Sequence, residues 1–223
     1  MSRAMNVTEA LQTRRSVRGY RHEPVPHDVL REMFSVAQHA PSWCNIQPWR
    51  VVVTSGEATV RLTQALAEAA VTTSPSPDFP WPGDYPEPYN THRRACGKAL
   101  YDAMGVARGD TVGRQAAWMA NYAAFGAPHV AMVSVDRRIG PYAMLDLGCW
   151  LQSLLLAAVE RGVSCCAQAC LSTHPDAVRA MLSIPADEGL VFGIAMGYEE
   201  GSVAANGCRT TRAPVEGNVR FVE

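Results

Sequence analysis

Two short stretches hold most of the residues whose types and spacing could do chemistry in this chain. Residues 14–18 read RRSVR, in which guanidinium groups and a hydroxyl can form charge-assisted bonds to phosphate oxygens. Residues 40–50 read APSWCNIQPWR, where two prolines stiffen a loop whose serine, asparagine and glutamine offer donors and acceptors to the edge of a flat heterocycle. The two tryptophans of this loop add flat apolar surface. Together the stretches predict a site for a phosphorylated heterocyclic cofactor.

Both stretches resemble the signature of the FMN-dependent nitroreductase family, RRSxR followed by APSxxNxQPWR. The resemblance covers nearly the whole chain, with a loose match in the middle third. Residues 85–110, YPEPYNTHRRACGKALYDAMGVARGD, resemble the subgroup that includes nitrobenzoate reductases. The resemblance implies FMN as cofactor, NADPH or NADH as electron donor, and a homodimer that holds the flavin at the subunit interface.

The resemblance also implies a role for each matching residue. It places Arg14 and Ser16 at the FMN phosphate, Arg15 near the ribityl chain and phosphate, and Arg18 at the pyrimidine edge of the flavin. A fixed positive charge at that edge stabilises the negative charge of the reduced ring and favours two-electron reduction. The other implied contacts are Pro41, Ser42, Trp43 and Asn45 around the isoalloxazine ring, Asn121 at the pyrimidine, Gln168 and Ala169 near N5, and Arg209 and Arg212 at the phosphate.

At two of these positions, Trp43 and Asn121, the sequence fits the family pattern less closely. Trp43 stands where the family commonly has a small residue, so we expect it to narrow the pocket. Asn121 fits an amide on a helix surface equally well, because the proline-rich stretch before it obscures the alignment. Neither the G-x-G-x-x-G pattern of a dinucleotide fold nor the G-x-x-x-x-G-K-[ST] of a P-loop occurs, which favours a mononucleotide.

Composition limits the kind of protein and its partners. The 223 residues are 48% hydrophobic and 18% charged, which suits one domain, residues 1–223, with ample material for a core. A formal net charge of -1 gives no basic field for nucleic acid. The first residues carry no apolar run, and the longest apolar run, residues 144–159, is interrupted by Asp146 and Gln152. These features predict a cytoplasmic protein without a nucleic-acid or membrane partner.

Histidine and cysteine spacing predicts no metal site. The six histidines lack a pattern such as H-E-x-x-H, and the seven cysteines include no C-x-x-C motif. We expect reduced thiols that serve as small buried hydrophobes. A nucleophilic Cys44 is the alternative inside the proline-bounded loop, although no base can be assigned to it.

Hydrophobic periodicity and turn residues predict the elements that must position these groups. Expected strands cover residues 50–54, 130–135, 164–171 with its loop, 190–198 and 219–222, and expected helices cover 9–12 after a Thr8 cap, 26–40, 58–70, 92–101, 114–125, 143–161 and 175–183. Their alternation alone suggests a doubly wound α/β domain. The resemblance instead implies an α+β fold, with a mixed, largely antiparallel central sheet flanked by helices in an intertwined homodimer. We take the latter as the prediction.

Two segments depart from this regular order. Residues 71–112 form an excursion whose first part holds six prolines and four aromatic residues, which rules out regular structure there. We expect it to lie over the protein as a wall of the substrate pocket, and a flexible surface loop is the alternative. The resemblance implies that the tail, residues 200–223, embraces the partner subunit and adds a strand to its sheet.

These observations predict an FMN-dependent nitroreductase that uses NAD(P)H to reduce nitroaromatic or quinone-like acceptors. One pocket that serves donor and acceptor in turn implies ping-pong kinetics. A flavoprotein of the same fold with another role stays open, namely reductive dehalogenation, flavin fragmentation or FMN binding without turnover.

Overall fold

The computed structural model describes residues 5–223, in which four strands form one sheet in the order β1-β2-β4-β3. The strands are β1 (Arg50–Ser55), β2 (His129–Asp136), β3 (Ser164–Gln168) and β4 (Glu188–Gly197). All three pairings are antiparallel, and β4 lies inside the sheet as predicted. The antiparallel sheet with flanking helices confirms the predicted α+β fold class, and the doubly wound alternative is wrong.

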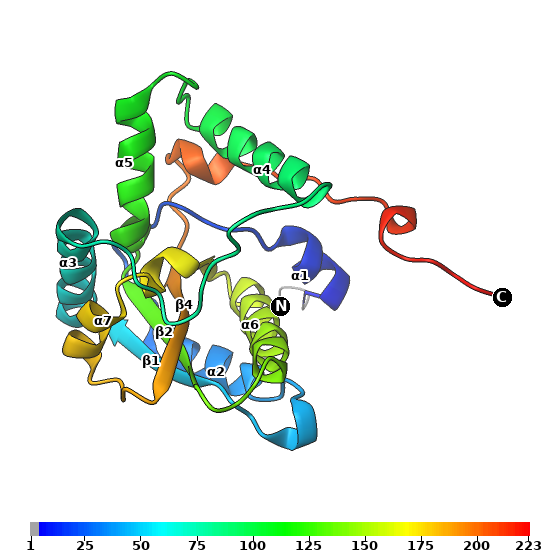
Figure 1. Cartoon of the computed structure of the whole chain (residues 1–223), viewed down its shortest axis with the longest axis horizontal. Coiled ribbons are helices and arrows are strands. Elements are labelled where there is room, and N and C mark those ends of the chain that lie inside the picture. The colour runs from blue at the N-terminus through cyan, green and yellow to red at the C-terminus, as the bar shows by residue number, and fades with distance from the viewer. Residues whose placement is uncertain (1–4) are drawn as a thin grey trace.

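Seven helices surround the sheet within the described residues (Figure 1). They are α1 (Val7–Thr13), α2 (His27–Ala37), α3 (Glu57–Thr72), α4 (Tyr89–Ala103), α5 (Thr111–Tyr122), α6 (Tyr142–Glu160) and α7 (Pro175–Leu182). Short 3-10 turns cover Trp43–Asn45, Ala124–Gly126, Ala169–Ser172, Ala204–Gly207 and Val215–Gly217. The predicted helices and inner strands are therefore present, with ends shifted by a few residues.

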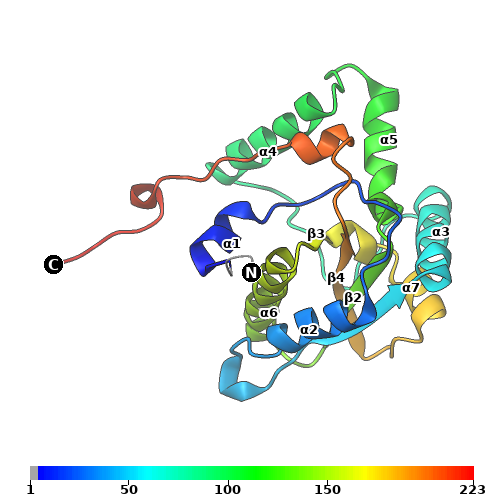
Figure 2. The same cartoon turned by 180° about the vertical axis from the view of Figure 1, so that it is seen from behind.

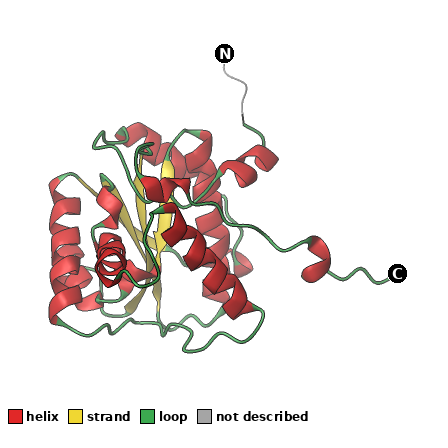
Figure 3. Cartoon of the chain, turned by 90° about the horizontal axis from the view of Figure 1, so that it is seen from above, coloured by secondary structure: helices red, strands yellow, loops and turns green. Residues whose placement is uncertain are grey.

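Helices cover both faces of the sheet, as the view from above shows (Figure 3). On one face, α2 and α6 pack with Trp49 and Trp150, whose rings stack 6.3 Å apart. On the other, α3, α5 and α7 pack around Leu62, Leu66 and Tyr122. Strand β2 is buried along nearly its whole length because both faces are covered.

The first helix begins at a different cap from the one predicted. Asn6 accepts a hydrogen bond from the Glu9 N–H, and the Glu9 carboxylate accepts one from the Asn6 N–H, each at 2.9 Å. This reciprocal capping box leaves Thr8 inside the first turn. The Thr8 cap is therefore wrong, because asparagine with an acid three residues later satisfies two free N–H groups at once.

Helix α6 is longer and more apolar than its neighbours. By length and composition alone it could cross a membrane, with a mean hydropathy of 1.5 in its most apolar window, contrary to the expectation from the interrupted run. Core helices of soluble proteins meet the same criteria, and α6 packs against α2 in the core. Only 39% of that window is buried. Tyr142 and Leu145, exposed by 58% and 62%, show that this helix is not buried on all sides within one chain.

The proline-rich excursion has a fixed base. Residues 73–88 contain no helix or strand, as predicted. Asp78 accepts hydrogen bonds from the Leu190 N–H at 2.8 Å and from Arg179, and it pairs with Arg137. The Phe79 ring lies against Gly189, where an added Cβ would come within 2.5 Å of the ring. The excursion thus lies over the protein at its base, while residues 81–88 are exposed.

The tail leaves the body of the molecule after the Ala204–Gly207 turn. Figures 1 and 2 show it extending away from the sheet and helices. The predicted strand at residues 219–222 does not form in the single chain, where Phe221 is 80% exposed. A lone strand has no neighbour for its backbone groups, so pairing with a partner subunit stays a prediction.

Candidate cofactor site

Residues 14–18 run beside the outer edge of the sheet. Helix α1 ends at Arg14, which is extended, and the Val17 N–H then donates to the Cys165 carbonyl of β3 at 3.1 Å. Val17 is buried, and the Tyr20 hydroxyl donates to its carbonyl at 2.9 Å. Because side chains alternate along an extended segment, Ser16 and Arg18 face away from the core while Val17 faces into it.

The arginine segment and the tail line one cavity of about 390 Å³. Helix α4 supplies Cys96 and Leu100 to its wall. The predicted cofactor-binding residues that line it are Arg14, Arg15, Ser16, Arg18, Arg209 and Arg212. The structure therefore brings together side chains that lie about 190 residues apart in the sequence. Five arginines and no carboxylate line this cavity, which suits an anion such as a phosphate.

The arginines differ in how far the protein already occupies them. The Arg14 guanidinium makes no hydrogen bond within residues 5–223, and its Nε is buried. Among the described residues, Arg212 donates only to Thr210 and to the Thr211 carbonyl beside it. Arg209 donates to the carbonyls of Asn206 and Cys208, at 2.8 and 2.9 Å. Within residues 5–223, Arg14 thus keeps all of its guanidinium donors for a bound anion, and Arg212 keeps its Nε and Nη2 donors. Arg18 donates to the Ser16 carbonyl at 3.4 Å through Nη1 and keeps the rest. The orphaned Arg14 Nε fits a phosphate ligand.

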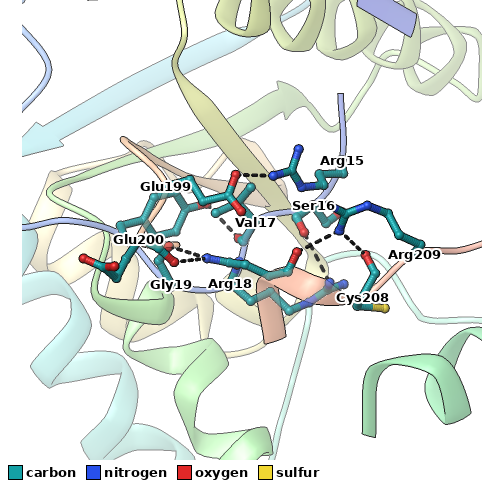
Figure 4. A network of polar contacts seen from close by, with 11 residues as sticks. Arg15, Ser16, Val17, Arg18, Gly19, Glu199, Glu200, Cys208 and Arg209 are labelled. Atoms are coloured by element: carbon teal, nitrogen blue, oxygen red, sulfur yellow. Dashed lines mark hydrogen bonds and ion pairs between the residues drawn. The ribbon is translucent and has the colours of Figure 1, made fainter. Parts of the chain in front are cut away.

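Two partners of this segment were not predicted from the sequence. Glu199 forms an ion pair with Arg15 (Figure 4). Asn206 is buried, and its Oδ1 accepts from the Arg18 N–H at 2.6 Å, while its Nδ2 donates to the carbonyls of Gly19 and Glu200. An asparagine before glycine indicates only a turn in the sequence, and no signal pointed to its long-range bonds.

Gly19, directly after the arginine segment, also packs closely against Val203 of the tail. A Cβ at Gly19 would lie 2.5 Å from the Val203 side chain, so glycine is required for the tail to approach. Asn206 and Gly19 together fix the start of the tail against the arginine segment. This contact explains how Arg209 reaches the same cavity as Arg14.

Gln168 and Asn121 form a second part of the predicted site. Gln168 ends β3, is buried, and donates through Nε2 to the Asn121 carbonyl at 3.1 Å and to its Oδ1 at 3.3 Å. The Gln168 Oε1 is buried without a hydrogen-bond partner among the described residues. Asn121 lies near the end of α5 and contacts Gln168, which distinguishes it from an isolated surface amide. Ala169 follows and is exposed.

The cysteines divide between the core and the surface. Cys165, Cys166 and Cys170 are buried, and burial raises the pKa of Cys165 to about 12 and that of Cys170 to about 11. These thiols stay protonated, as predicted for small buried hydrophobes. Cys44 and Cys96 are exposed, so that prediction is wrong for them. Within residues 5–223 no cluster of histidine, cysteine or acidic side chains could hold a metal.

The proline-bounded loop is exposed and has an unusual backbone. Cys44, Asn45 and Gln47 have φ angles of 46°, 57° and 47°, a region that non-glycine residues adopt rarely. The Gln47 N–H donates to the Ser42 hydroxyl at 3.0 Å. Trp43 is 60% exposed, while Trp49 packs in the core, so only the first tryptophan offers free apolar surface.

The two halves of the predicted site lie at opposite ends of α6. Trp43 contacts Tyr142 and Asp146 near the start of the helix. Arg14 and Arg15 share a small hollow with Leu155 and Val159 near its end. Leu155 follows Asp146 by nine residues and Tyr142 by thirteen, which corresponds to about 14 and 20 Å at 1.5 Å per residue. One chain therefore does not bring Pro41, Ser42, Trp43 and Asn45 to the arginine cavity.

Comparison with known proteins gives consistent matches over most of the chain. The family model described as "Nitroreductase family" matches residues 11–198. Nitroreductase NfnB of Mycolicibacterium smegmatis is 38% identical over 212 residues, which cover 95% of this chain and 90% of that protein. A 4-nitrobenzoate reductase of Nocardioides sp. is 38% identical over 215 residues, covering 94% and 87%. The crystal structure of FMN-dependent NfnB from Mycobacterium smegmatis in complex with NADPH superimposes with a TM-score of 0.93 at 36% identity, covering 97% of both chains.

Proposed function

The chain belongs to the nitroreductase family, and we propose that it is an FMN-dependent oxidoreductase that uses NADPH or NADH to reduce nitroaromatic compounds. Quinone-like compounds are further acceptors. The cavity lined by five arginines and no carboxylate carries this proposal, because it provides an anion site where a flavin mononucleotide needs one. The relatives that act on nitrobenzoate and the NADPH-bound structural neighbour support the choice of acceptor and donor.

The residues of the cavity would divide the cofactor between them. Arg14, Ser16 and Arg212 bind the phosphate, with Arg209 beside them. Arg15, already paired with Glu199, lies near the phosphate and ribityl chain. The Arg18 guanidinium holds a positive charge at the pyrimidine edge, where it stabilises negative charge on the reduced ring.

Bound FMN supplies the redox chemistry, since its ring accepts a hydride from a nicotinamide and returns electrons to an acceptor. The chain positions the reactants and excludes water. Gln168 offers a buried, unpaired Oε1, and Asn121 orients the Gln168 amide. Ala169 follows directly and is expected near N5. If donor and acceptor use one pocket in turn, the kinetics are ping-pong.

Two observations support a homodimer with the flavin between its subunits. The ring-binding loop contacts α6 through Trp43 at Tyr142 and Asp146, about 14–20 Å along the helix from Leu155, which shares a hollow with Arg14. A second chain is therefore needed to bring such a loop to the arginine cavity. Helix α6 also exposes Tyr142 and Leu145, and the tail exposes Phe221, which are surfaces that a partner can cover. The balanced charge supports an enzyme without a nucleic-acid partner, and we propose that it is cytoplasmic.

An anaerobic absorbance experiment tests the proposed function. The purified protein is scanned before and after addition of NADPH or NADH, and again after addition of 4-nitrobenzoate. We expect a flavin spectrum that bleaches with the nicotinamide and returns with the nitro compound. A colourless protein that cannot be reconstituted with FMN overturns the proposal, and a yellow protein that neither nicotinamide bleaches supports FMN binding without turnover.

A further inference from the structure

An acidic side chain is buried in the apolar helix α6. Asp146 is 4% exposed, and its Oδ1 accepts a hydrogen bond from the Trp43 backbone N–H at 3.1 Å. Its Oδ2 is buried without a hydrogen-bond partner in the described part of the chain. Burying a carboxylate is costly even when one oxygen is bonded. Because an apolar helix does not need an acidic residue at this position, we attribute the presence of Asp146 to its contact with Trp43.

A second α6 residue contacts Trp43 through its ring. The Tyr142 and Trp43 ring centroids lie 5.2 Å apart, with their planes inclined by 40°. Tyr142 and Asp146 are four residues apart, so they share one face of the helix. That face holds Trp43 by its main chain and its side chain together.

The loop has a backbone that needs such support. Cys44, Asn45 and Gln47 all adopt positive φ angles, which persist only where the surroundings enforce them. The other hydrogen bonds of residues 41–48 are internal to the loop, such as Gln47 to Ser42. Among the described residues, the bond from Trp43 to Asp146 is the only hydrogen bond that joins residues 41–48 to the rest of the chain.

We infer that Asp146 and Tyr142 are positioning residues for the ring-binding loop of the proposed flavin site. Asp146 fixes the main chain at Trp43 and so sets the direction of the exposed Asn45, while Tyr142 sets the plane of the Trp43 ring against which a flat acceptor would stack. Neither residue needs to touch the cofactor. The inference rests on the proposed function for the identity of the ligand, but the clamp itself is a property of the apoprotein.

Four variants separate the hydrogen bond from the ring contact. Asp146→Leu removes the acceptor at similar size and suits an apolar helix, whereas Asp146→Asn keeps an oxygen for the Trp43 N–H. Tyr142→Ala removes the ring contact, and Tyr142→Phe keeps it. Asp176→Leu is the control, because Asp176 is a fully exposed acid in the first turn of α7.

Hydrogen exchange of the peptide covering residues 42–48 in the apoprotein is the first measurement. We expect exchange about 10- to 100-fold faster in Asp146→Leu, since the hydrogen bond that joins the loop to α6 is lost. Asp146→Asn and Asp176→Leu should exchange within about threefold of the wild type. Wild-type exchange in Asp146→Leu, or equally fast exchange in Asp146→Asn, would overturn the inference for Asp146. If Asp146→Leu does not fold, faster exchange in Tyr142→Ala but not in Tyr142→Phe supports the clamp, and equal exchange in both overturns it.

Steady-state kinetics of the holoenzyme give the second measurement. Tyr142→Ala should raise the KM for 4-nitrobenzoate about tenfold with little change in kcat, and Tyr142→Phe should restore the wild-type KM. An unchanged KM in Tyr142→Ala overturns the role in acceptor stacking. A wild-type protein that binds no FMN would instead overturn the proposed function. The exchange results on the apoprotein would still show whether Asp146 and Tyr142 hold the loop in place.

Discussion

The arginine edge, residues 14–18 with Arg209 and Arg212, and the proline-bounded loop, residues 41–48, show two ways of preparing a binding surface. The arginine edge is assembled within one chain. Hydrogen bonds to Asn206 and to the β3 backbone fix it, and its arginines, only some of whose N–H groups are already hydrogen-bonded, line a cavity. The loop is exposed, bonded mostly to itself, and held at a single point on α6. The first lines an anion site within a single chain, whereas in the proposed homodimer the second would meet its ligand across the subunit interface.

The largest effect on FMN binding should come from replacing Arg14 or Arg212, which form no ion pair among the described residues. Arg14→Ala and Arg212→Ala should each weaken FMN binding by about 1.5–3 kcal/mol, or roughly ten- to hundredfold, because each removes a charge-assisted bond. Fluorescence titration of the apoprotein with FMN measures this. Arg138→Ala is the matched control, since Arg138 is exposed and pairs with Asp136 outside the cavity. Wild-type affinity in both cavity variants would remove the phosphate assignment.

Mixed dimers test whether the two regions act across subunits. Arg14→Ala damages the arginine edge and Asn45→Ala damages the loop. If each site takes its arginines from one chain and its loop from the other, dimers formed from one chain of each kind hold one intact site. We expect such heterodimers to regain about half of the wild-type FMN sites and turnover, measured after purification with two different affinity tags. Homodimers of each variant are the controls, and no recovery in the heterodimer would place both regions in the same chain's site.

A smaller effect on FMN binding is expected from a residue that holds the arginine edge in place than from an arginine that binds the cofactor. Asn206→Ala removes a buried side chain that makes three hydrogen bonds and should lower the free energy of unfolding by about 1–3 kcal/mol. Because Asn206 aligns Arg18 with the tail, FMN affinity should fall with it. Thermal unfolding without FMN separates the two effects. Gln64→Ala, on the exposed face of α3, should leave both quantities unchanged.

The smallest expected effect concerns pH, and it lies away from both regions. Burial lowers the pKa of His129 below its usual 6.5, although the Val25 N–H donates to its Nε2. The unfolded chain therefore takes up a proton at higher pH than the folded chain. This contribution to stability is present above pH 6.5 and is lost as the pH falls below it. Urea unfolding at pH 7.5 and 5.5 should show the loss, and His129→Gln should reduce it. An equal pH dependence in the variant would assign the loss to other groups.

From the sequence, the chemistry of individual side chains could be predicted more readily than the contacts that bring them together. Arginines, a hydroxyl and prolines carry their chemistry in their own side chains, so their roles could be argued from residue type alone. Their partners could not, because the bonds from Asn206 to Arg18 and from Glu199 to Arg15 join segments about 185 residues apart. Inner strands were predictable since burial on both faces leaves a continuous apolar run.

Other differences arise from competition or from a missing partner. Asn6 replaced Thr8 as the helix cap because Glu9 completes a capping box only with Asn6. The alternating residues 219–222 satisfy the pattern of a strand, but a strand needs a neighbour that the single chain does not provide. The separation of the two site halves along α6 was likewise hidden, because spacing in the sequence does not reveal on which end of a helix a loop lies.

The base of the excursion divides that segment into a part that belongs to the fold and a part that can be exchanged. Asp78 and Phe79 are tied to Arg179, Leu190 and Gly189, all of which lie on or beside the sheet. Beyond them, residues 81–88 make few contacts with the body and re-enter it through α4. For protein engineering, this boundary is a natural graft point: segments of different length and side-chain shape can be transplanted between Pro80 and Pro88 while the sheet and the arginine edge stay intact.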